Sequence, residues 1–479
     1  MHRRSLLSLA AATALLSACA HGPSSESVLR QAELATGADR LKTLRYAGSG
    51  SGATFGQAYQ PGMAWPRIAV PSYTRWIDYE NASLREDSVR TRAEVQGGGA
   101  LPPMGQGEQR VSAWVRGEHA WNMTGPAPSA APVALDGRIH DLWTTPHGVI
   151  KAAMRNKASV RTDGGVSIVS FQEPGRYRAS AWIGADGLVQ RVDSVVPHPV
   201  TGDTAVSTLY SDWRDHGGIK FPARIVQSQG GYPVLDLNIT EVQPNAVAAV
   251  DVPPVVSNFV ERVDAQKVTD GVWFLAGGSH NSVLVEFADH LMLIESPLYD
   301  GRAQAVLSEA RRLVPGKDIR YVVNSHHHFD HAGGLRAAAA TGATLVVSEA
   351  ARPWYERTFA QGNTVRPDAL QRAGGKSTFA GVAGKRVFSD ATRTVEVHFI
   401  EDSAHAQGFM MAWLPRERLL VEADAYTPGA PNTPPPAQAN PLNVNLVDNV
   451  DRLRLDVDRI LPLHGRVVPY ADLKTAARR

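Results

Sequence analysis

The sequence of 479 residues contains a single cysteine, Cys19, and this scarcity excludes an internal disulfide. The mature protein must therefore be stabilised by packed cores, for which an apolar fraction of 43% is ample. Excess charge is also missing, because 49 Lys and Arg residues oppose 47 Asp and Glu residues. Without a basic stripe or a run of like charge, the sequence does not predict binding to nucleic acid.

The N-terminus lacks an apolar run long enough to span a bilayer, since Leu6–Leu16 is too short. Two arginines precede this run, and Leu16-Ser-Ala-Cys19 follows it in the manner of a bacterial lipobox. We therefore expect residues 1–19 to be a lipoprotein signal peptide, with Cys19 acylated and the protein anchored in the periplasm, on the outer membrane. Ordinary signal cleavage near Cys19 is the alternative.

The length predicts two domains, and the first, residues 24–255, shows the alternation of β-strands. Two alternating runs, for example, flank Gly184-Ala-Asp-Gly187, which is a strong hairpin signal. This pattern predicts a large antiparallel sheet, and it resembles the curved sheet of bacterial lipoprotein-carrier domains. Its scattered histidines are predicted to be surface or structural residues, and its tryptophans to be core; a ligand-binding concave face is the alternative.

Residues 256–479 alternate strands and helices, which with the first domain predicts an α+β protein. A proline-containing stretch, residues 243–257, separates the two parts. One apolar face over residues 302–313 predicts a helix, and Ile319–Val323 predicts a buried strand.

This strand leads into the stretch Asn324-Ser-His-His-His-Phe-Asp-His-Ala-Gly-Gly334, which carries the chemistry. Residues two apart in extended backbone share a side, so His326 and His328 face one way. A second pair, Asp330 and His331, follows where the chain must turn. Imidazoles and a carboxylate gathered in this way can bind two divalent cations without thiolate.

The pattern His326-x-His328-x-Asp330-His331 resembles the signature of the metallo-β-lactamase superfamily. The resemblance implies a four-layer αβ/βα sandwich, with metals at one edge between two sheets. It also implies a further ligand in each of three later segments, and these are His405 before Gln407-Gly408, Asp424 after the strand near 419–422, and His464 before Gly465.

The resemblance implies metal one on His326, His328 and His405, metal two on Asp330, His331 and His464, and Asp424 with a solvent oxygen between them. Asp330 is then also expected to orient the nucleophile as a catalytic residue. Zinc is the default for a hydrolase with this donor set, although iron and manganese suit it as well. Two such cations lower the pKa of a bridging water.

Other polar residues near these motifs are weaker candidates. We expect His280 to be a surface histidine, with contact to substrate as the alternative, and we treat His398 as the rival of His405. Glu295 and Asp402 are candidates to hold the imidazoles in place. The proline-rich segment 426–441 is expected to shape one wall of a cleft.

The resemblance favours a dinuclear metal-dependent hydrolase acting on a small molecule with a carbonyl-type bond: a lactone, β-lactam, thioester or related ester. Two alternatives remain open. One is a mononuclear iron-dependent thiol oxygenase; the other is an envelope-binding lipoprotein with a structural metal site. The substrate and the oligomeric state do not follow from the sequence.

Overall fold

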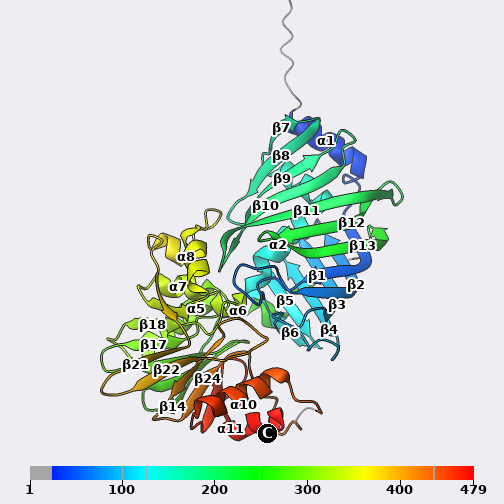
Figure 1. Ribbon diagram of the computed structural model, residues 1–479. Helices are drawn as coiled ribbons and strands as arrows, with labels where there is room; N and C mark the ends of the chain where they lie inside the picture. The colour runs from blue at the N-terminus through cyan, green and yellow to red at the C-terminus, as the bar shows by residue number, and fades with distance from the viewer. Residues whose placement is uncertain (1–23, 100, 126, 248, 435–436) are drawn as a thin grey trace, which may run out of the picture.

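The N-terminal part of the computed structural model is one antiparallel sheet of 13 strands (Figure 1). The structure describes residues 24–99, 101–125, 127–247, 249–434 and 437–479. The strands of this sheet are β1 (Thr43–Ala53), β2 (Arg67–Asp78), β3 (Ser83–Arg92), β4 (Gln109–Arg116), β5 (His119–Thr124), β6 (Ala127–Ala130), β7 (Ser159–Asp163), β8 (Val166–Glu173), β9 (Tyr177–Ile183), β10 (Val189–His198), β11 (Gly202–Asp215), β12 (Lys220–Gln229) and β13 (Tyr232–Pro244). This confirms the predicted antiparallel sheet.

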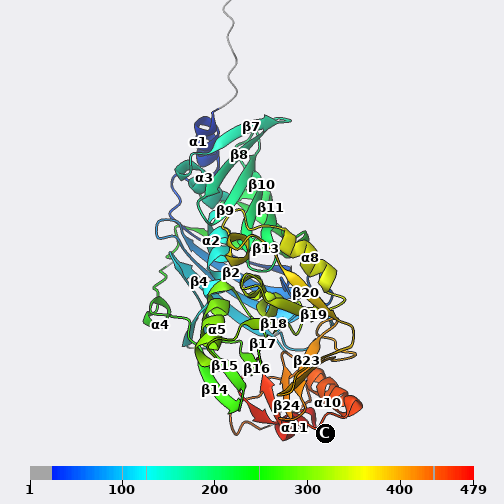
Figure 2. The same cartoon turned by 90° about the vertical axis from the view of Figure 1, so that its left-hand side faces the viewer.

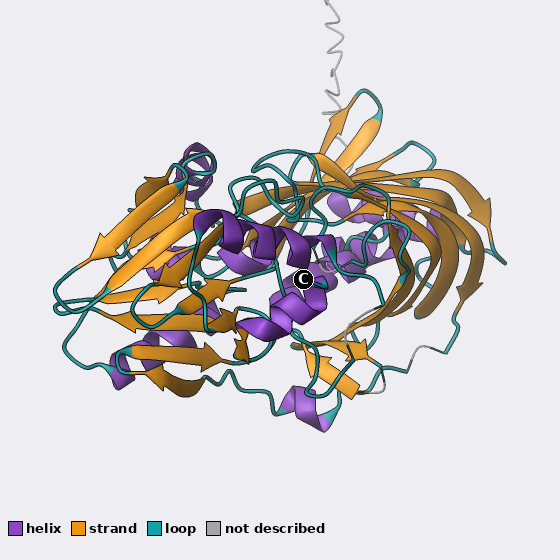
Figure 3. Ribbon diagram, turned by 60° about the horizontal axis from the view of Figure 1, so that its bottom comes forward, coloured by secondary structure: helices purple, strands orange, loops and turns teal. Residues whose placement is uncertain are grey.

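Neighbouring strands in this sheet are also neighbours in sequence, apart from the pairing of β1 with β13, which joins the two halves. Four short helical elements accompany the sheet: α1 (Ser25–Thr36), η1 (Pro132–Ala134), α2 (Leu135–Trp143) and α3 (Pro146–Arg155). Ser24 caps α1 by accepting from the amide of Ser27, and Gly37 ends it in the left-handed region. The sheet curves around helices (Figure 3), and α1 to α3 contribute to its hydrophobic core.

The C-terminal part contains two mixed sheets, of seven and six strands. The first comprises β14 (Asp264–Thr269), β15 (Val272–Ala276), β16 (Ser282–Glu286), β17 (Leu291–Ile294), β18 (Ile319–Val323), β19 (Thr344–Ser348) and β20 (Thr378–Val382). The second comprises β21 (Lys385–Ser389), β22 (Thr394–Phe399), β23 (Met410–Leu414), β24 (Leu419–Glu422), β25 (Arg459–Pro462) and β26 (Val468–Pro469).

Helices cover the outer faces of both sheets, so the C-terminal part has four layers. The helices of this part are α5 (Asp300–Leu313), α6 (Phe329–Ala332), α7 (Leu335–Ala339), α8 (Arg352–Ala360), α9 (Ala369–Arg372), α10 (Pro441–Leu453) and α11 (Tyr470–Ala477). The short helix α4 (Pro254–Ser257) precedes them and packs against β5 and β6 of the N-terminal sheet. One core joins the two sheets with α10 and α11, and a second joins the seven-stranded sheet with α5, α7 and α8. Figure 2 shows α8 beside β20 of this sheet. The α+β fold class is confirmed.

The two parts share a hydrophobic core around the β1–β2 loop, residues 54–66. Phe55 and Trp65 of this loop pack edge-on against Phe329 of α6, at centroid distances of 5.3 and 5.5 Å. The main-chain amide of Phe329 also donates to the carbonyl oxygen of Gly56 over 3.1 Å. The N-terminal part therefore touches the segment that carries the predicted metal ligands.

Two predictions from the sequence remain predictions. The signal peptide, with Cys19, lies outside the described residues. The boundary near residue 256 falls in α4, between the last strand of the large sheet and β14. In the described part of the chain, none of the helices has the length and apolarity needed to cross a lipid bilayer.

Candidate metal centre

The motif after β18 is held in place by its own backbone and by Tyr355. The Tyr355 hydroxyl donates to the side-chain oxygen of Asn324 over 2.6 Å, where the buried strand ends. His328 has an extended backbone and directly precedes the first residue of α6. The predicted turn at Asp330 and His331 is therefore a short helix, and both side chains come from its single turn.

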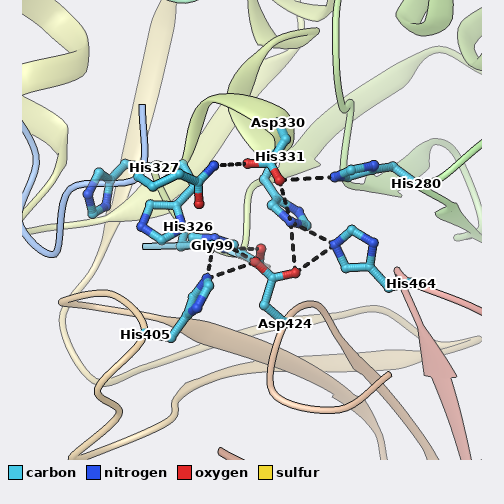
Figure 4. A network of polar contacts seen from close by, with 12 residues as sticks. Gly99, His280, His326, His327, Asp330, His331, His405, Asp424 and His464 are labelled. Carbon is cyan, nitrogen blue, oxygen red and sulfur yellow. Dashed lines mark hydrogen bonds and ion pairs between the residues drawn. The ribbon is translucent and has the colours of Figure 1, made fainter. Parts of the chain in front are cut away.

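The first candidate site comprises His326, His328, His405 and Asp424, whose donor atoms lie within 4.8 Å of one another. His405 comes from the loop between β22 and β23, and Asp424 follows β24. The Nε2 atom of His405 lies 2.7 Å from Oδ2 of Asp424, and that of His326 lies 3.4 Å from the same oxygen. Residues distant in sequence thus converge on one point (Figure 4).

The second candidate site comprises His280, Asp330, His331 and His464, again within 4.8 Å. His464 Nε2 lies 2.6 Å from Oδ1 of Asp424, and His331 Nε2 lies 3.1 Å from it. The two carboxylate oxygens of Asp424 therefore face different histidine groups, which is the arrangement of a bridging ligand (Figure 4).

The prediction that His280 is a surface histidine was wrong. Its side chain is buried, and Nε2 lies 3.3 Å from Oδ2 of Asp330. The Gly-Gly-Ser loop before it turns the chain inward, and the ring packs against His464 at a centroid distance of 4.2 Å. Sequence spacing gave no signal for this placement, because His280 lies alone, 46 residues before the motif.

In His326, His464 and His328, one ring nitrogen has a polar partner outside the centre, which orients the other nitrogen inward. Nδ1 of His326 lies 2.9 Å from the Ser325 hydroxyl, and Nδ1 of His464 lies 2.9 Å from the carbonyl oxygen of Ser279. The Nε2–H of His328 donates over 3.1 Å to the carbonyl oxygen of Ala58, in the N-terminal part. Such outer partners fix the tautomer of a metal-binding histidine.

The donor set fits divalent cations. Nδ1 of His328 is buried and has no hydrogen-bond partner in the described structure. The Nε2 atoms of His326 and His405 face each other at 3.0 Å, an approach that two imidazoles make when they bind one cation. Burial lowers the pKa of His326 and of His328 well below the usual value, so both rings are neutral and have lone pairs to donate.

The carboxylates complement these neutral rings. Burial acts to raise the pKa of Asp330, but His331 and a hydrogen bond from His280 outweigh it and hold this pKa well below the usual value. Burial also acts to raise the pKa of Asp424, but its charge interactions with His331 and His405 outweigh this effect and hold the pKa well below the usual value. Both groups are therefore carboxylates at neutral pH, and the centre offers imidazole and anionic oxygen.

Of the other residues that the sequence suggested near the centre, only Glu295 contacts one of the candidate ligands. Glu295 is fully buried, accepts from the amide of Ser325 over 2.5 Å, and places its second oxygen 3.4 Å from Nδ1 of His331. Asp402 is exposed. His398 pairs with Glu396 at 2.8 Å and is not part of either candidate site.

Sequence reasoning missed Gln57, which comes from the β1–β2 loop. Its Nε2 donates over 2.8 Å to Oδ1 of Asp330, the residue expected to orient the nucleophile. No local pattern could identify it, since 273 residues separate the two side chains.

The centre opens into a cleft of about 620 Å³. Its base holds His405, Asp424 and His464, together with Asp330 and His280. One wall comes from the proline-rich segment, through Thr427, Asn440 and Pro441, as predicted for residues 426–441. Another wall comes from the β3–β4 loop of the N-terminal sheet, for which the sequence predicted no role.

Part of the chain matches a known protein family. Residues 275–464 match the family model of the metallo-beta-lactamase superfamily. The chain therefore carries a C-terminal domain of the metallo-beta-lactamase superfamily, and both candidate sites lie within the matched residues. Members of this superfamily have varied activities, so the match alone does not define a substrate.

Solved structures similar to the chain include a metallo-beta-lactamase from Pontibacter korlensis, with 17% identity and a TM-score of 0.35, covering 45% of this chain and 98% of that one. The metallo-beta-lactamase FIM-1 from Pseudomonas aeruginosa, in its mono-zinc form, has 17% identity, a TM-score of 0.34 and coverages of 45% and 94%. Rubredoxin oxygen:oxidoreductase from Desulfovibrio gigas has 17% identity, a TM-score of 0.36 and coverages of 45% and 60%. The chain matched no curated protein.

Proposed function

We propose that the protein is a dinuclear metal-dependent hydrolase acting on a carbonyl-type bond in a small molecule: a lactone, β-lactam, thioester or related ester. The observation that supports this most directly is Asp424, whose two oxygens face two separate histidine groups at 2.6 and 2.7 Å. Divalent cations bound there would lower the pKa of a water molecule and would polarise a carbonyl group.

The protein's own residues provide the rest of the chemistry. Asp330 faces the cleft as a carboxylate and can accept the proton released when water adds to the carbonyl carbon. Gln57 and His280 hold its two oxygens in place. Cleavage of the C–O, C–N or C–S bond then gives a carboxylate and an alcohol, amine or thiol, which takes up a proton.

The test is a chromogenic panel of lactone, β-lactam, thioester and phosphodiester substrates, with the metal content of the protein defined. We expect turnover of a carbonyl substrate that is lost on chelation, restored by zinc, and abolished by His328→Ala with the fold retained. The control is His398→Ala, which removes a histidine outside both candidate sites. Unchanged turnover in His328→Ala would refute the assignment, and iron with oxygen uptake in place of hydrolysis would indicate a thiol oxygenase.

For location, we propose that Cys19 carries a lipid anchor on the periplasmic side of the outer membrane. The lipobox pattern Leu16-Ser-Ala-Cys19 supports this proposal. Labelling with radioactive palmitate in a bacterial host should mark the wild-type chain and not Cys19→Ser; equal labelling of both would contradict it.

A further inference from the structure

The wall of the cleft contributed by the N-terminal sheet is apolar. It consists of the β3–β4 loop, residues 93–99 and 101–108, which places Val95, Leu101 and Met104 along the cleft. Val95 and Met104 are 61% and 52% exposed, although both are large apolar side chains. Leu442 at the start of α10 lines the same cleft. Exposed apolar side chains around a polar centre are typical of a binding site for a small molecule.

This loop is fixed in place by Arg92, at the end of β3. Its guanidinium donates to the carbonyl oxygens of Gly99 at 2.9 Å, Leu101 at 3.1 Å and Pro102 at 3.2 Å, and also to that of Gly97. The amide of Gly97 donates over 2.9 Å to the carbonyl oxygen of Ala404, the residue before His405. Figure 4 shows Gly99 together with the residues of the centre. The apolar wall therefore has a set position relative to the candidate metal ligands.

The same contacts leave little in the cleft to bind an anionic substituent. Among the described residues that line the cleft, Arg92 is the only lysine or arginine. Its N–H groups donate hydrogen bonds to carbonyl oxygens of the loop. A substituent that reaches away from the centre along this wall thus meets carbon atoms. Burial of such carbon contributes favourable free energy in proportion to its area.

We propose that the β3–β4 loop selects the substrate of the hydrolase by binding an apolar acyl substituent, an alkyl or aryl chain attached to the scissile carbonyl group. This inference rests on the proposed function. The substrate class is then a neutral ester, lactone or thioester with an apolar acyl part, and the N-terminal sheet supplies its specificity.

The test compares p-nitrophenyl acetate with p-nitrophenyl octanoate, using the full chain with zinc bound. Burial of one methylene contributes at most about four-fold, so six added methylenes allow a large preference even when only partly buried. We expect kcat/KM to favour octanoate by at least about ten-fold, and this ratio to fall about ten-fold in the variant Val95→Ser/Met104→Ser. The matched control is Val387→Ser/Met154→Ser, whose side chains are similarly exposed, at 49% and 48%, but lie outside the cleft.

Hydrolysis of both esters at equal rates, with no effect of the loop variant, would overturn the inference and leave the proposed function standing. If neither ester is hydrolysed, binding decides. Calorimetry with acetohydroxamate and octanohydroxamate, which chelate the metal without turnover, should show tighter binding of the longer chain, and the loop variant should lose this preference. Equal affinity for the two hydroxamates, or no binding of either, would overturn the inference.

Discussion

At the scale of single residues, Glu295 is a buried side chain outside both candidate sites that contacts one of their histidines, His331. It holds the left-handed conformation, with φ of 69°, which is uncommon outside glycine and places its carboxylate beneath His331. One oxygen accepts from the amide of Ser325, so both halves of the motif depend on this one group.

We therefore expect Glu295→Gln to weaken zinc binding by about 10- to 100-fold, because an amide cannot serve both neighbours as an acceptor. Competition with a chromophoric chelator measures this affinity. Glu286→Gln is the control, since Glu286 pairs with Lys317 away from the centre. Equal affinities in both variants would show that Glu295 does not position His331.

A second residue-scale prediction concerns His147, in the core of the N-terminal sheet. Burial lowers the pKa of His147 to about 4, below the usual value near 6.5. Between these values the unfolded chain takes up a proton and the folded chain does not, so stability falls as the pH drops from 6.5 to 4. The contribution is about 3 kcal/mol.

His147→Leu removes this titration while keeping a buried apolar side chain. We expect the free energy of unfolding of the wild type, relative to the variant, to fall by about 3 kcal/mol between pH 8 and pH 4. Urea unfolding at a series of pH values measures the difference. A difference that does not depend on pH would contradict the buried neutral state of His147.

At the scale of elements, two loops of the N-terminal sheet contact the centre, and each contributes different groups to it. The β1–β2 loop supplies Gln57 and the carbonyl oxygen of Ala58, while the β3–β4 loop supplies the apolar wall. A glycine in the β1–β2 loop allows this loop to lie close to Phe329 of α6. Gly56 has φ of +81°, and a Cβ atom there would lie 2.5 Å from the ring of Phe329.

Gly56→Ala should therefore destabilise the protein by about 2 to 4 kcal/mol, from a strained backbone together with overpacking against Phe329. Gly217→Ala is matched for the strain alone, because Gly217 has φ of +70° and nothing within 4 Å of an added Cβ; it should cost about 1 to 2 kcal/mol. Thermal unfolding measures both. Equal losses of stability in the two variants would mean that the β1–β2 loop shifts and avoids overpacking against Phe329.

Prediction from sequence succeeded where the pattern was local. The alternation in residues 177–192 predicts a hairpin, and the structure has β9 and β10 there. The spacing of the motif predicted that His326 and His328 face one way, and the structure places both in the first candidate site. The same reasoning missed α2 and α3. It also missed Gln57, because its contact with Asp330 joins segments 273 residues apart and leaves no periodic trace.

At the scale of the whole molecule, the centre is built by both parts of the chain. Trp65 of the N-terminal part belongs to the same hydrophobic core as Phe329, the residue that directly follows His328. Trp121 is also buried, with 1% of its surface exposed against 7% for Trp65, but it packs with Val250 and Val256 in a separate small cluster. The two tryptophans therefore offer a comparison between shared and separate cores.

We expect Trp65→Ala and Trp121→Ala each to destabilise the protein by about 3 to 5 kcal/mol, the usual cost of emptying a buried aromatic site. Only Trp65→Ala should also weaken zinc binding, because it leaves a cavity under the ring of Phe329 and so loosens His328. Zinc affinity is measured at a temperature where both variants are fully folded, as judged by circular dichroism. If Trp121→Ala weakens zinc binding as much as Trp65→Ala, the coupling follows global stability. If only Trp65→Ala does so, the packing of the N-terminal part against α6 holds the ligands in place.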